Sequence, residues 1–484
     1  MTRIVVLGAG VAGHTAALHL KRMLGKKHEV VVVSPNAKWN WIPSNIWVGV
    51  GRMSVDQVTF PLAPIYARKG IDFHQALATE IHPEGDADHE SPYVIATSTV
   101  AGQEGTPELI EYDFLINCTG PKLNFAATPG LGPEGYSNSV CTALHAEETA
   151  KQFKAAVARC KAGEKLRFVI GTGHGTCTCE GAAFEYTFNV EHELRQAGVR
   201  DNAEVVYFTN EAELGDFGVG GMVFTQQGYQ TTSQLWTESL YRERGVQAIL
   251  GAHATKVEPG KLSYEQLDGS MHELDFDFAM LLPPFRGADL KAFDKAGEDI
   301  SAQMFNPAGF LKVDANYSAG AYENWKADDW PKHYVSPLYD NVFAAGIAFA
   351  PPHQVSRPRT TPNGTVITPA PPRTGMPSGM IAKAVAQTIA DRINGRPVPP
   401  HGAPMTGLGA ACVASAGNGW LSGSAAAMTM NPVVPNWQKY PQTGRDIKTT
   451  TGEIGLSGHW VKYMLHVLFI YKAKGRPFWW LIPE

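Results

Sequence analysis

The sequence has few charged residues and few cysteines, and it has no excess of basic over acidic residues. Only 18% of its 484 residues are charged and 44% are hydrophobic, an apolar content that excludes intrinsic disorder and permits a large buried core. The formal net charge is -5, so we predict no nucleic-acid partner. Six cysteines are too few for a disulfide-rich secreted scaffold, yet they are enough for a redox site.

Targeting, membrane-spanning and metal-binding patterns are missing as well. The chain runs from Met1 directly into an apolar stretch that ends in Gly8, which predicts a buried strand rather than a signal peptide. No uncharged apolar run reaches the roughly 18 residues that a spanning helix needs. The histidines and cysteines have no zinc or haem spacing, so no metal site is predicted.

The C-terminus carries a segment suited to a membrane surface. Residues 460–471 read WVKYMLHVLFIY and are followed by basic and aromatic residues. A short apolar helix with such flanks predicts peripheral attachment at the lipid headgroups, here of the cytoplasmic membrane. A buried terminal helix or a dimer contact is the alternative interpretation.

A glycine-rich turn follows the first predicted strand, residues 3–8. It reads Gly8-Ala9-Gly10-Val11-Ala12-Gly13 and opens a predicted helix over 11–24. The first glycine permits a tight turn, the second lets a pyrophosphate approach the backbone, and the third lets helix and strand pack closely. The pattern predicts dinucleotide binding at the helix N-terminus, with a ligand-free strand–helix turn as the alternative.

The ribose contact of this site departs from the usual pattern. Where the second strand ends, an acidic residue commonly grips the ribose, but here Ser34 is followed by Pro35 and Asn36. We therefore expect Ser34, Asn36 or the backbone to make that contact. FAD fits better than NAD, because the motif lies at the extreme N-terminus. In addition, residues 341–348 (NVFAAGIA) resemble the returning strand of flavoproteins with two dinucleotide-binding domains.

A second unit of strand, glycine turn, helix and strand lies inside the chain. A predicted strand at 166–171 leads through Gly171-Thr172-Gly173-His174-Gly175-Thr176 to a predicted helix at 181–198. Two such units predict an α/β protein with two Rossmann-like domains and parallel sheets. The predicted division is an FAD-binding domain, a second Rossmann-like domain, a return to the FAD-binding domain and a C-terminal region, with bounds 1–140, 141–325, 326–400 and 401–484.

The inner glycine turn continues into two cysteines, Cys177 and Cys179. A helix N-terminus favours the thiolate and lowers the pKa of a thiol, so the inner site is interpreted as converted from dinucleotide binding to thiol chemistry. The alternative is a retained NADH site with a structural cysteine pair. Cys118 and Cys160 are interpreted as packing residues.

Several further motifs resemble those of the sulfide:quinone oxidoreductases. The resemblance extends over nearly the whole chain, and the cysteines together with the PSNIWVGVG stretch are its most specific part. The motifs are residues 43–51 (PSNIWVGVG), 119–123 (TGPKL), 140–146 (VCTALHA), 343–348 (FAAGIA), 372–375 (PRTG) and 411–414 (ACVA).

The resemblance implies an FAD enzyme that uses no NAD(P)H. Cys179 and Cys412 would hold a sulfur bridge on one side of the flavin, with Cys141 assisting. Hydrosulfide opens the bridge and releases a thiolate, two electrons pass to the flavin, and quinone then reoxidises it, while polysulfide or zero-valent sulfur leaves. Membership also implies a homo-oligomer on the membrane.

Further site residues follow from the same resemblance or from their position. Glu185, on the helix that Cys179 opens, and His145, four residues after Cys141, are candidate acid–base groups, although a structural role is as plausible for each. Aromatic residues of the C-terminal segment are candidates for the quinone pocket: Trp460, Phe469 and Tyr471. The remaining implied flavin contacts are Ser44, Asn45, Thr119, Gly120, Gly346, Thr374 and Gly375.

The chain also departs from the family. Asp216 stands where the family often has a histidine, and His466 is interpreted as the replacement for its lysine in the C-terminal helix. Cys177 is extra, and the Pro- and Thr-rich residues 351–375 predict a long surface loop. Three rival functions remain open: a type II NADH:quinone oxidoreductase, a flavocytochrome-type sulfide dehydrogenase, and a non-catalytic flavin or sulfur-carrier binding protein.

Overall fold

The computed structural model describes all residues except 179, 319, 374 and 418. Two predicted site residues, Cys179 and Thr374, therefore lie outside the described residues. In the described part of the chain, no helix combines the length and apolar character needed to cross a membrane.

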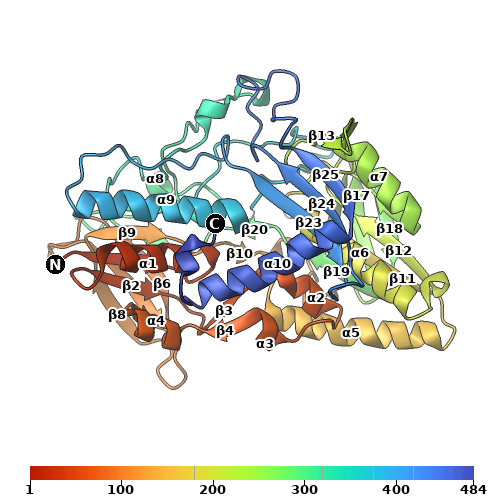
Figure 1. The fold of residues 1–484 in the computed structure, drawn as a ribbon, viewed down its shortest axis with the longest axis horizontal. Helices are drawn as coiled ribbons and strands as arrows, with labels where there is room; N and C mark the ends of the chain where they lie inside the picture. The colour runs from red at the N-terminus through yellow and green to blue at the C-terminus, as the bar shows by residue number, and fades with distance from the viewer. Residues whose placement is uncertain (179, 319, 374, 418) are drawn as a thin grey trace.

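The first sheet is parallel and carries the N-terminal glycine turn (Figure 1). Its strand order is β22 (Val342–Ala344), β9 (Phe114–Asn117), β1 (Arg3–Leu7), β2 (Glu29–Val33) and β5 (Asp72–His74). Helices α1 (Val11–Leu24) and α9 (Gly375–Ile393) pack against each other beside it. The late strand β22 pairs with β9, so the chain returns to this sheet as the sequence predicts.

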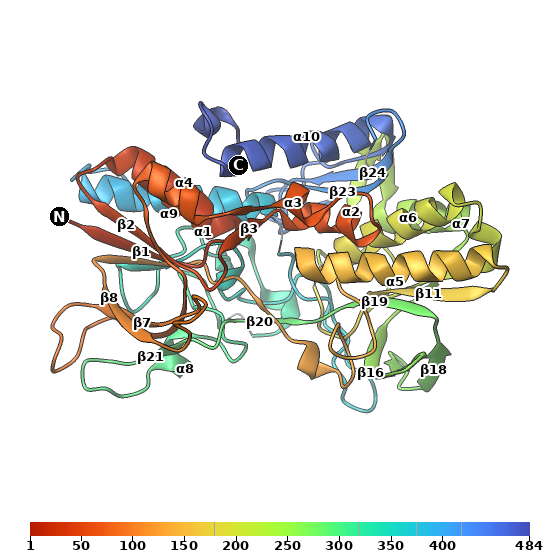
Figure 2. The ribbon, with the colours of Figure 1, turned by 90° about the horizontal axis from the view of Figure 1, so that it is seen from below.

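The second sheet is also parallel, which confirms the predicted α/β fold with two Rossmann-like units. Its order is β15 (Val246–Ile249), β12 (Ala203–Phe208), β11 (Leu166–Thr172) and β19 (Phe278–Leu282). Three helices pack on it: α5 (Ala143–Lys161), α6 (Glu180–Gln196) and α7 (Ser233–Arg244). Its other face packs through apolar residues onto an antiparallel sheet of β16 (Ala252–Glu258), β17 (Lys261–Gln266) and β18 (Met271–Asp275) (Figure 2).

A C-terminal sheet lies between α6 and the last helix, α10 (Leu456–Ala473) (Figure 2). Its order is β14 (Tyr229–Thr232), β13 (Val223–Gln226), β25 (Thr451–Gly455), β24 (Ser424–Met430) and β23 (Ala410–Ala416). Strand β23 touches α6 on one side and α10 on the other. This layer brings Cys412 of β23 to α6, although the two are far apart in sequence.

The remaining elements are short. A four-stranded sheet has the order β21 (Lys291–Ala292), β6 (Ala76–His82), β7 (Tyr93–Ser98) and β8 (Pro107–Glu111), and two small pairs join β3 (Lys38–Asn40) to β4 (Thr59–Pro61) and β10 (Lys122–Leu123) to β20 (Phe285–Arg286). The short helices are α2 (Asn45–Gly49), α3 (Val55–Val58), α4 (Ala63–Lys69) and α8 (Ser301–Met304).

The segment 351–373 is a long irregular loop, as its composition predicts, but only part of it lies on the surface. Val355, Ser356, Ile367 and Thr368 are buried. The segment crosses the inner glycine turn, where the Thr368 amide donates to the Gly175 carbonyl at 2.8 Å. Proline and threonine predict solvent exposure, which residues 357–360 and 362–364 show, whereas backbone hydrogen bonds to the second domain help to bury the part around Thr368.

Candidate functional site

The N-terminal glycine turn has room for a pyrophosphate at one position only. A Cβ at Gly8 would lie 2.2 Å from the Cys118 carbonyl oxygen, and one at Gly13 would lie 1.9 Å from the Gly8 carbonyl oxygen. At Gly10, by contrast, a Cβ would meet no atom within 4 Å. Because Gly10 alone faces open space, the turn fits a dinucleotide that approaches the backbone there.

Other predicted flavin contacts gather where the strands of the first sheet end. Thr119 and Gly120 follow β9 closely, and Gly346 follows β22. A Cβ at Gly346 would lie 2.6 Å from the Cβ of Ala12 in α1, so the returning segment meets the glycine turn. Ligands of parallel sheets bind at this carboxyl edge.

The predicted ribose contacts share one turn after β2. Ser34 is buried and its Oγ accepts a hydrogen bond from the amide of Asn36 at 3.3 Å.

Three further predicted flavin contacts lie elsewhere. Ser44 and Asn45 are also buried but make protein contacts, since Ser44 Oγ lies 2.9 Å from His466 Nδ1 of α10. Gly375 begins α9.

The inner glycine turn is closed by the protein itself. A Cβ at Gly173 would lie 2.5 Å from the Leu131 side chain, and one at Gly175 would lie 2.3 Å from the Val366 carbonyl oxygen. The Gly175 amide donates to His253 Nδ1 at 2.9 Å, and the Ala370 amide donates to the Cys177 carbonyl at 2.8 Å. The Gly175 amide, which a pyrophosphate could have accepted from, therefore already has a partner, which supports the interpretation of a converted site.

Cys412 lies against the first turn of α6. A Cβ at Gly181 would lie 2.8 Å from Cys412 Sγ, so any residue larger than glycine at this position would crowd the sulfur. Burial, and then the charge of Glu185, raise the pKa of the Cys412 thiol to about 11, and Lys462 acts in the opposite direction. A free Cys412 is thus held as the thiol at neutral pH.

Glu185 and Lys462 form a buried ion pair beside this sulfur. Lys462 Nζ of α10 lies 2.9 Å from Glu185 Oε2, and the Ser415 amide donates to Glu185 Oε1 at 3.2 Å. Burial raises the pKa of Glu185 and Lys462 lowers it. The sequence did not single out Lys462. Lys462 is buried one turn before His466 in α10, and the interpretation of His466 as the replacement for the family's lysine stays a prediction.

Cys141 and His145 do not share a helix turn. Helix α5 begins at Ala143 with Thr142 as its N-cap, so Cys141 precedes the helix. The Cys141 amide donates to Ser139 Oγ at 3.2 Å, and the His145 ring lies edge-on to Phe125. Burial raises the pKa of Cys141 to about 11.

Cys118, Cys160 and Cys177 are buried packing residues. Cys177 Sγ donates to the Leu282 carbonyl at 3.1 Å, and burial raises the pKa of its thiol well above the ordinary value. The expected lowering of the Cys177 pKa by the helix N-terminus is therefore wrong, because desolvation outweighs the helix dipole. Cys118 and Cys160 are buried, as predicted.

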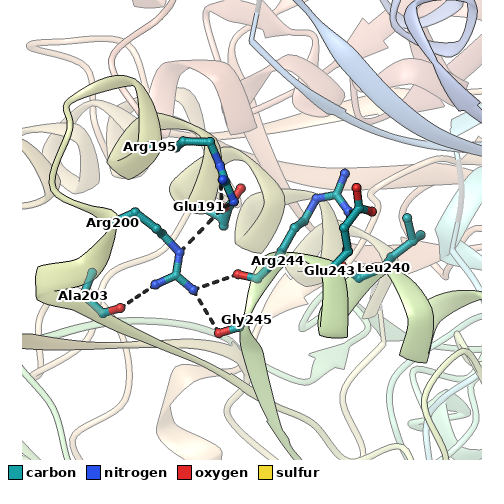
Figure 3. A network of polar contacts seen from close by, with 8 residues as sticks. All are labelled: Glu191, Arg195, Arg200, Ala203, Leu240, Glu243, Arg244 and Gly245. Atoms are coloured by element: carbon teal, nitrogen blue, oxygen red, sulfur yellow. Dashed lines mark hydrogen bonds and ion pairs between the residues drawn. The ribbon is translucent and has the colours of Figure 1, made fainter.

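The C-terminal half of α6 is fixed by arginines (Figure 3). Arg195 and Arg200 both reach Glu191 of α6, the latter with Nε at 3.5 Å from Oε1. Arg200 also donates to the carbonyls of Arg244 and Gly245, at 2.8 and 2.9 Å, at the end of α7. These bonds hold α6 against α7 and so position its N-terminal turn.

The predicted quinone residues are spread along α10. Trp460 is 40% exposed and stacks on Trp420, whereas Phe469 is buried and stacks on Trp41. Tyr471 donates its hydroxyl to the Pro477 carbonyl at 2.9 Å. The three side chains therefore contact different parts of the protein, and the exposed Trp420 was not singled out from the sequence.

Comparison with known proteins supports one family. No protein-family model matches the sequence. The sulfide-quinone reductase of Aquifex aeolicus is 28% identical over 471 residues, which cover 97% of this chain and 91% of that protein. The mitochondrial sulfide:quinone oxidoreductase of Mus musculus is 24% identical over 294 residues, which cover 59% of this chain and 57% of that protein.

Solved structures agree with this result. The X-ray structure of the Aquifex aeolicus sulfide:quinone oxidoreductase matches with a TM-score of 0.74 and 26% identity, covering 98% of this chain and 92% of that one. The structure of NDH2 from Plasmodium falciparum in complex with NADH matches with a TM-score of 0.59 and 14% identity over 99% of both chains, which shows a shared fold only. Over nearly its whole length the chain is thus a homologue of the sulfide:quinone oxidoreductases, as its motifs predict.

Proposed function

We propose that this protein oxidises sulfide and passes the electrons through FAD to quinone. The observation that carries the proposal is the position of Cys412 Sγ against Gly181, the second residue after Cys179 in sequence. The two cysteines implied to hold the sulfur bridge thus come from segments that meet at the start of α6. Cys141, from the segment before α5, is proposed to assist.

The closed inner turn argues against NADH as the electron donor. A type II NADH:quinone oxidoreductase needs a nucleotide at this position, but Leu131 and Val366 fill the space beside Gly173 and Gly175. Sulfide needs no such site, because its electrons enter through sulfur bound to cysteine.

FAD is proposed to bind at the N-terminal glycine turn. Gly10 and the α1 N-terminus would hold its pyrophosphate, with Ser34 or Asn36 near the ribose and Thr119, Gly120 and Gly346 along the chain. The flavin supplies a carrier that accepts two electrons from sulfur and returns them to quinone. We also propose three domains. Residues 1–140 together with 326–400 form the FAD-binding domain, residues 141–325 form the second Rossmann-like domain, and residues 401–484 form the C-terminal region.

Two glycine variants separate flavin binding from folding. We expect Gly10→Ala to fold normally but to purify without flavin, because the new Cβ meets no protein atom yet occupies the pyrophosphate approach. Gly13→Ala should instead lose stability, since its Cβ would lie 1.9 Å from the Gly8 carbonyl oxygen. Flavin absorbance per protein and the melting temperature measure the two effects. A yellow Gly10→Ala protein with normal flavin content would contradict the site.

Helix α10 supports peripheral attachment to a membrane because its polar residues face the protein interior and its apolar residues face outward. Its buried face carries polar residues, among them His459, Lys462 and His466, whereas Val461, Met464 and Val467 are 40–52% exposed. A helix on a water-facing surface shows the opposite order. The exposed apolar face, with neighbouring exposed Trp420 and Leu421, suits lipid acyl chains and a quinone dissolved among them.

Charge on this apolar face should release the protein from membranes. We expect the double variant Met464→Glu/Val467→Glu to lose most of its binding to lipid vesicles, because two carboxylates would have to enter the acyl region. Vesicle co-sedimentation measures the bound fraction. Leu144→Glu, at a 70% exposed site on α5, is the control and should bind like the wild type. Equal binding of the double variant would contradict α10 as the attachment surface.

Quinone is proposed to reach the protein from the same face. Trp460, Phe469 and Tyr471 of α10 are its proposed contacts, and the same helix carries Lys462, which forms a buried ion pair with Glu185. We also propose a homo-oligomer on the cytoplasmic membrane, in line with the family resemblance.

An anaerobic reduction experiment tests the function. The purified flavoprotein is mixed with sulfide or, separately, with NADH, and flavin absorbance is followed before a soluble quinone is added. Bleaching by sulfide and recovery on addition of quinone is the expected result. Bleaching by NADH but not by sulfide would overturn the proposal in favour of an NADH:quinone oxidoreductase.

A further inference from the structure

A buried cluster of three carboxyl groups lies beside the first turn of α6. Glu180, Glu211 and Asp216 belong to α6 and to the loop after β12. Glu180 Oε2 lies 3.3 Å from the position of a Cβ on Gly218, so its carboxyl group faces the turn that Asp216 begins. Glu211 Oε1 accepts the Phe217 amide of the same turn at 2.8 Å. The three groups thus converge on one turn.

Glu180 is the exceptional member of the cluster. Its side chain is completely buried, and among the described residues neither of its carboxylate oxygens has a hydrogen bond of ordinary geometry, with only the Asn210 side chain close enough to act on it. An ionised carboxylate in this position would be very costly, so a role in structure alone does not account for it. Glu180 also directly follows Cys179 in sequence, and Gly181, which follows it, touches Cys412.

Burial raises the pKa of all three carboxyl groups of the cluster. Burial, and then the charge of Glu211, raise the pKa of Glu180 well above its ordinary value. Burial raises the pKa of Glu211 to about 7 and also raises that of Asp216. At neutral pH the cluster therefore retains protons that isolated carboxyl groups would have lost.

Other polar groups face the cluster without neutralising it. The Tyr207 hydroxyl lies 3.0 Å from Glu211 Oε2 and 3.4 Å from the Glu180 carbonyl oxygen. Arg445 faces Asp216, but its guanidinium donates to the backbone carbonyls of Val219, Gly221, Pro432 and Val433. The remaining titratable neighbours are Cys177, Tyr241 and Tyr322.

The cluster also leads from the interior to the surface. Glu180 and Glu211 are fully buried, whereas Asp216 is partly exposed and accepts a hydrogen bond from Ser356 Oγ. We propose that Glu180, Glu211 and Asp216 form a proton-transfer route that carries the proton released by sulfide oxidation from the first turn of α6 to solvent. This inference rests on the proposed function.

The route balances the sulfide half-reaction. When hydrosulfide becomes zero-valent sulfur bound to cysteine, its S–H bond breaks and its two electrons pass to the flavin and on to quinone, which takes up two protons from water as it becomes quinol. The proton moves to a carboxyl oxygen of Glu180, a proton passes from Glu180 to Glu211 and on to Asp216, and Asp216 releases one to water. The cluster ends each cycle with the protons it began with.

Neutral isosteric variants test the route in the flavin-loaded protein. In Glu180→Gln we expect flavin reduction by sulfide to slow by about a hundredfold to ten-thousandfold, the contribution typical of a positioned proton carrier. Its pH dependence should flatten, while reoxidation by quinone stays unchanged. Glu213→Gln, an exposed carboxyl group on the same loop, is the control and should behave like the wild type.

A readout independent of turnover accompanies these rates. Infrared spectra of the wild type at neutral pH should contain the carbonyl absorption of buried protonated carboxyl groups, and Glu180→Gln should lose part of its intensity. Asp216→Asn changes the partly exposed end of the proton-transfer route and should slow flavin reduction as well. This variant replaces Glu180→Gln in the experiment if Glu180→Gln fails to fold.

The outcomes separate the two proposals. Wild-type rates and pH profile in folded Glu180→Gln, or in Asp216→Asn, would overturn the route while leaving the sulfide oxidation intact. A wild type whose flavin is not reduced by sulfide at all would overturn the proposed function, and the route with it.

Discussion

Cys412→Ser should abolish the reduction of the flavin by sulfide. Serine keeps the size of the side chain against Gly181, but its hydroxyl cannot form the sulfur bridge to which hydrosulfide adds. We expect the rate of anaerobic flavin reduction to fall on the order of a thousandfold or more, as for the loss of a catalytic nucleophile. Stopped-flow absorbance with sulfide in excess measures this rate.

A second cysteine provides the matched control. Cys160 is buried on α5, and its thiol donates to the Asn202 carbonyl at 3.7 Å, a bond that serine can also make. Cys160→Ser should therefore retain the wild-type rate. Reduction of Cys412→Ser at the wild-type rate would rule out the sulfur bridge and leave the homology intact. Loss of bound flavin in Cys412→Ser would instead mean that the sulfur is structural.

Local patterns account for the parts of the fold that the sequence predicts well. The glycine turn and the apolar period define the helix over 11–24, and α1 has those bounds. The return of residues 342–344 to the first sheet was predicted from the motif around Gly346, and β22 confirms it. Glu185 was predicted as a site residue from its spacing to Cys179 on one helix, and the structure places it beside Cys412.

Contacts between distant segments were the features that the sequence did not predict. Strand β24 has a small-residue sequence, SAAAMTM, without an alternating pattern, so its pairing between β23 and β25 has no local signal. Lys462 lies in a helix of mostly apolar residues, and only the position of α10 over β23 and β24 turns it toward Glu185. Glu180 gave no signal, because a carboxylate at a helix start is normally a solvated partner of the helix dipole.

Removing one partner of the buried Glu185–Lys462 pair should lower the free energy of unfolding more than replacing both partners by neutral residues. Lys462→Met leaves Glu185 buried without its partner, and we expect a loss of about 3–5 kcal/mol in the free energy of unfolding. The double variant Glu185→Gln/Lys462→Met removes both charges and should recover most of it. Urea unfolding of the flavoprotein measures both. Lys332→Met, which breaks an exposed pair with Asp328, is the control and should cost less than about 1 kcal/mol.

The loss in Lys462→Met should also depend on pH. Burial already raises the pKa of Glu185 above its ordinary 4.5, and removal of Lys462 raises it further. Above about pH 4.5 the unfolded chain releases the proton that the folded variant retains, so the deficit should be small in mild acid and grow as the pH rises. The wild type should show a weaker trend, because Lys462 favours the ionised carboxylate. A deficit that stays constant across this range, or that shrinks with rising pH, would mean that Lys462 stabilises the protein through packing of its alkyl chain and not through the charge of Glu185.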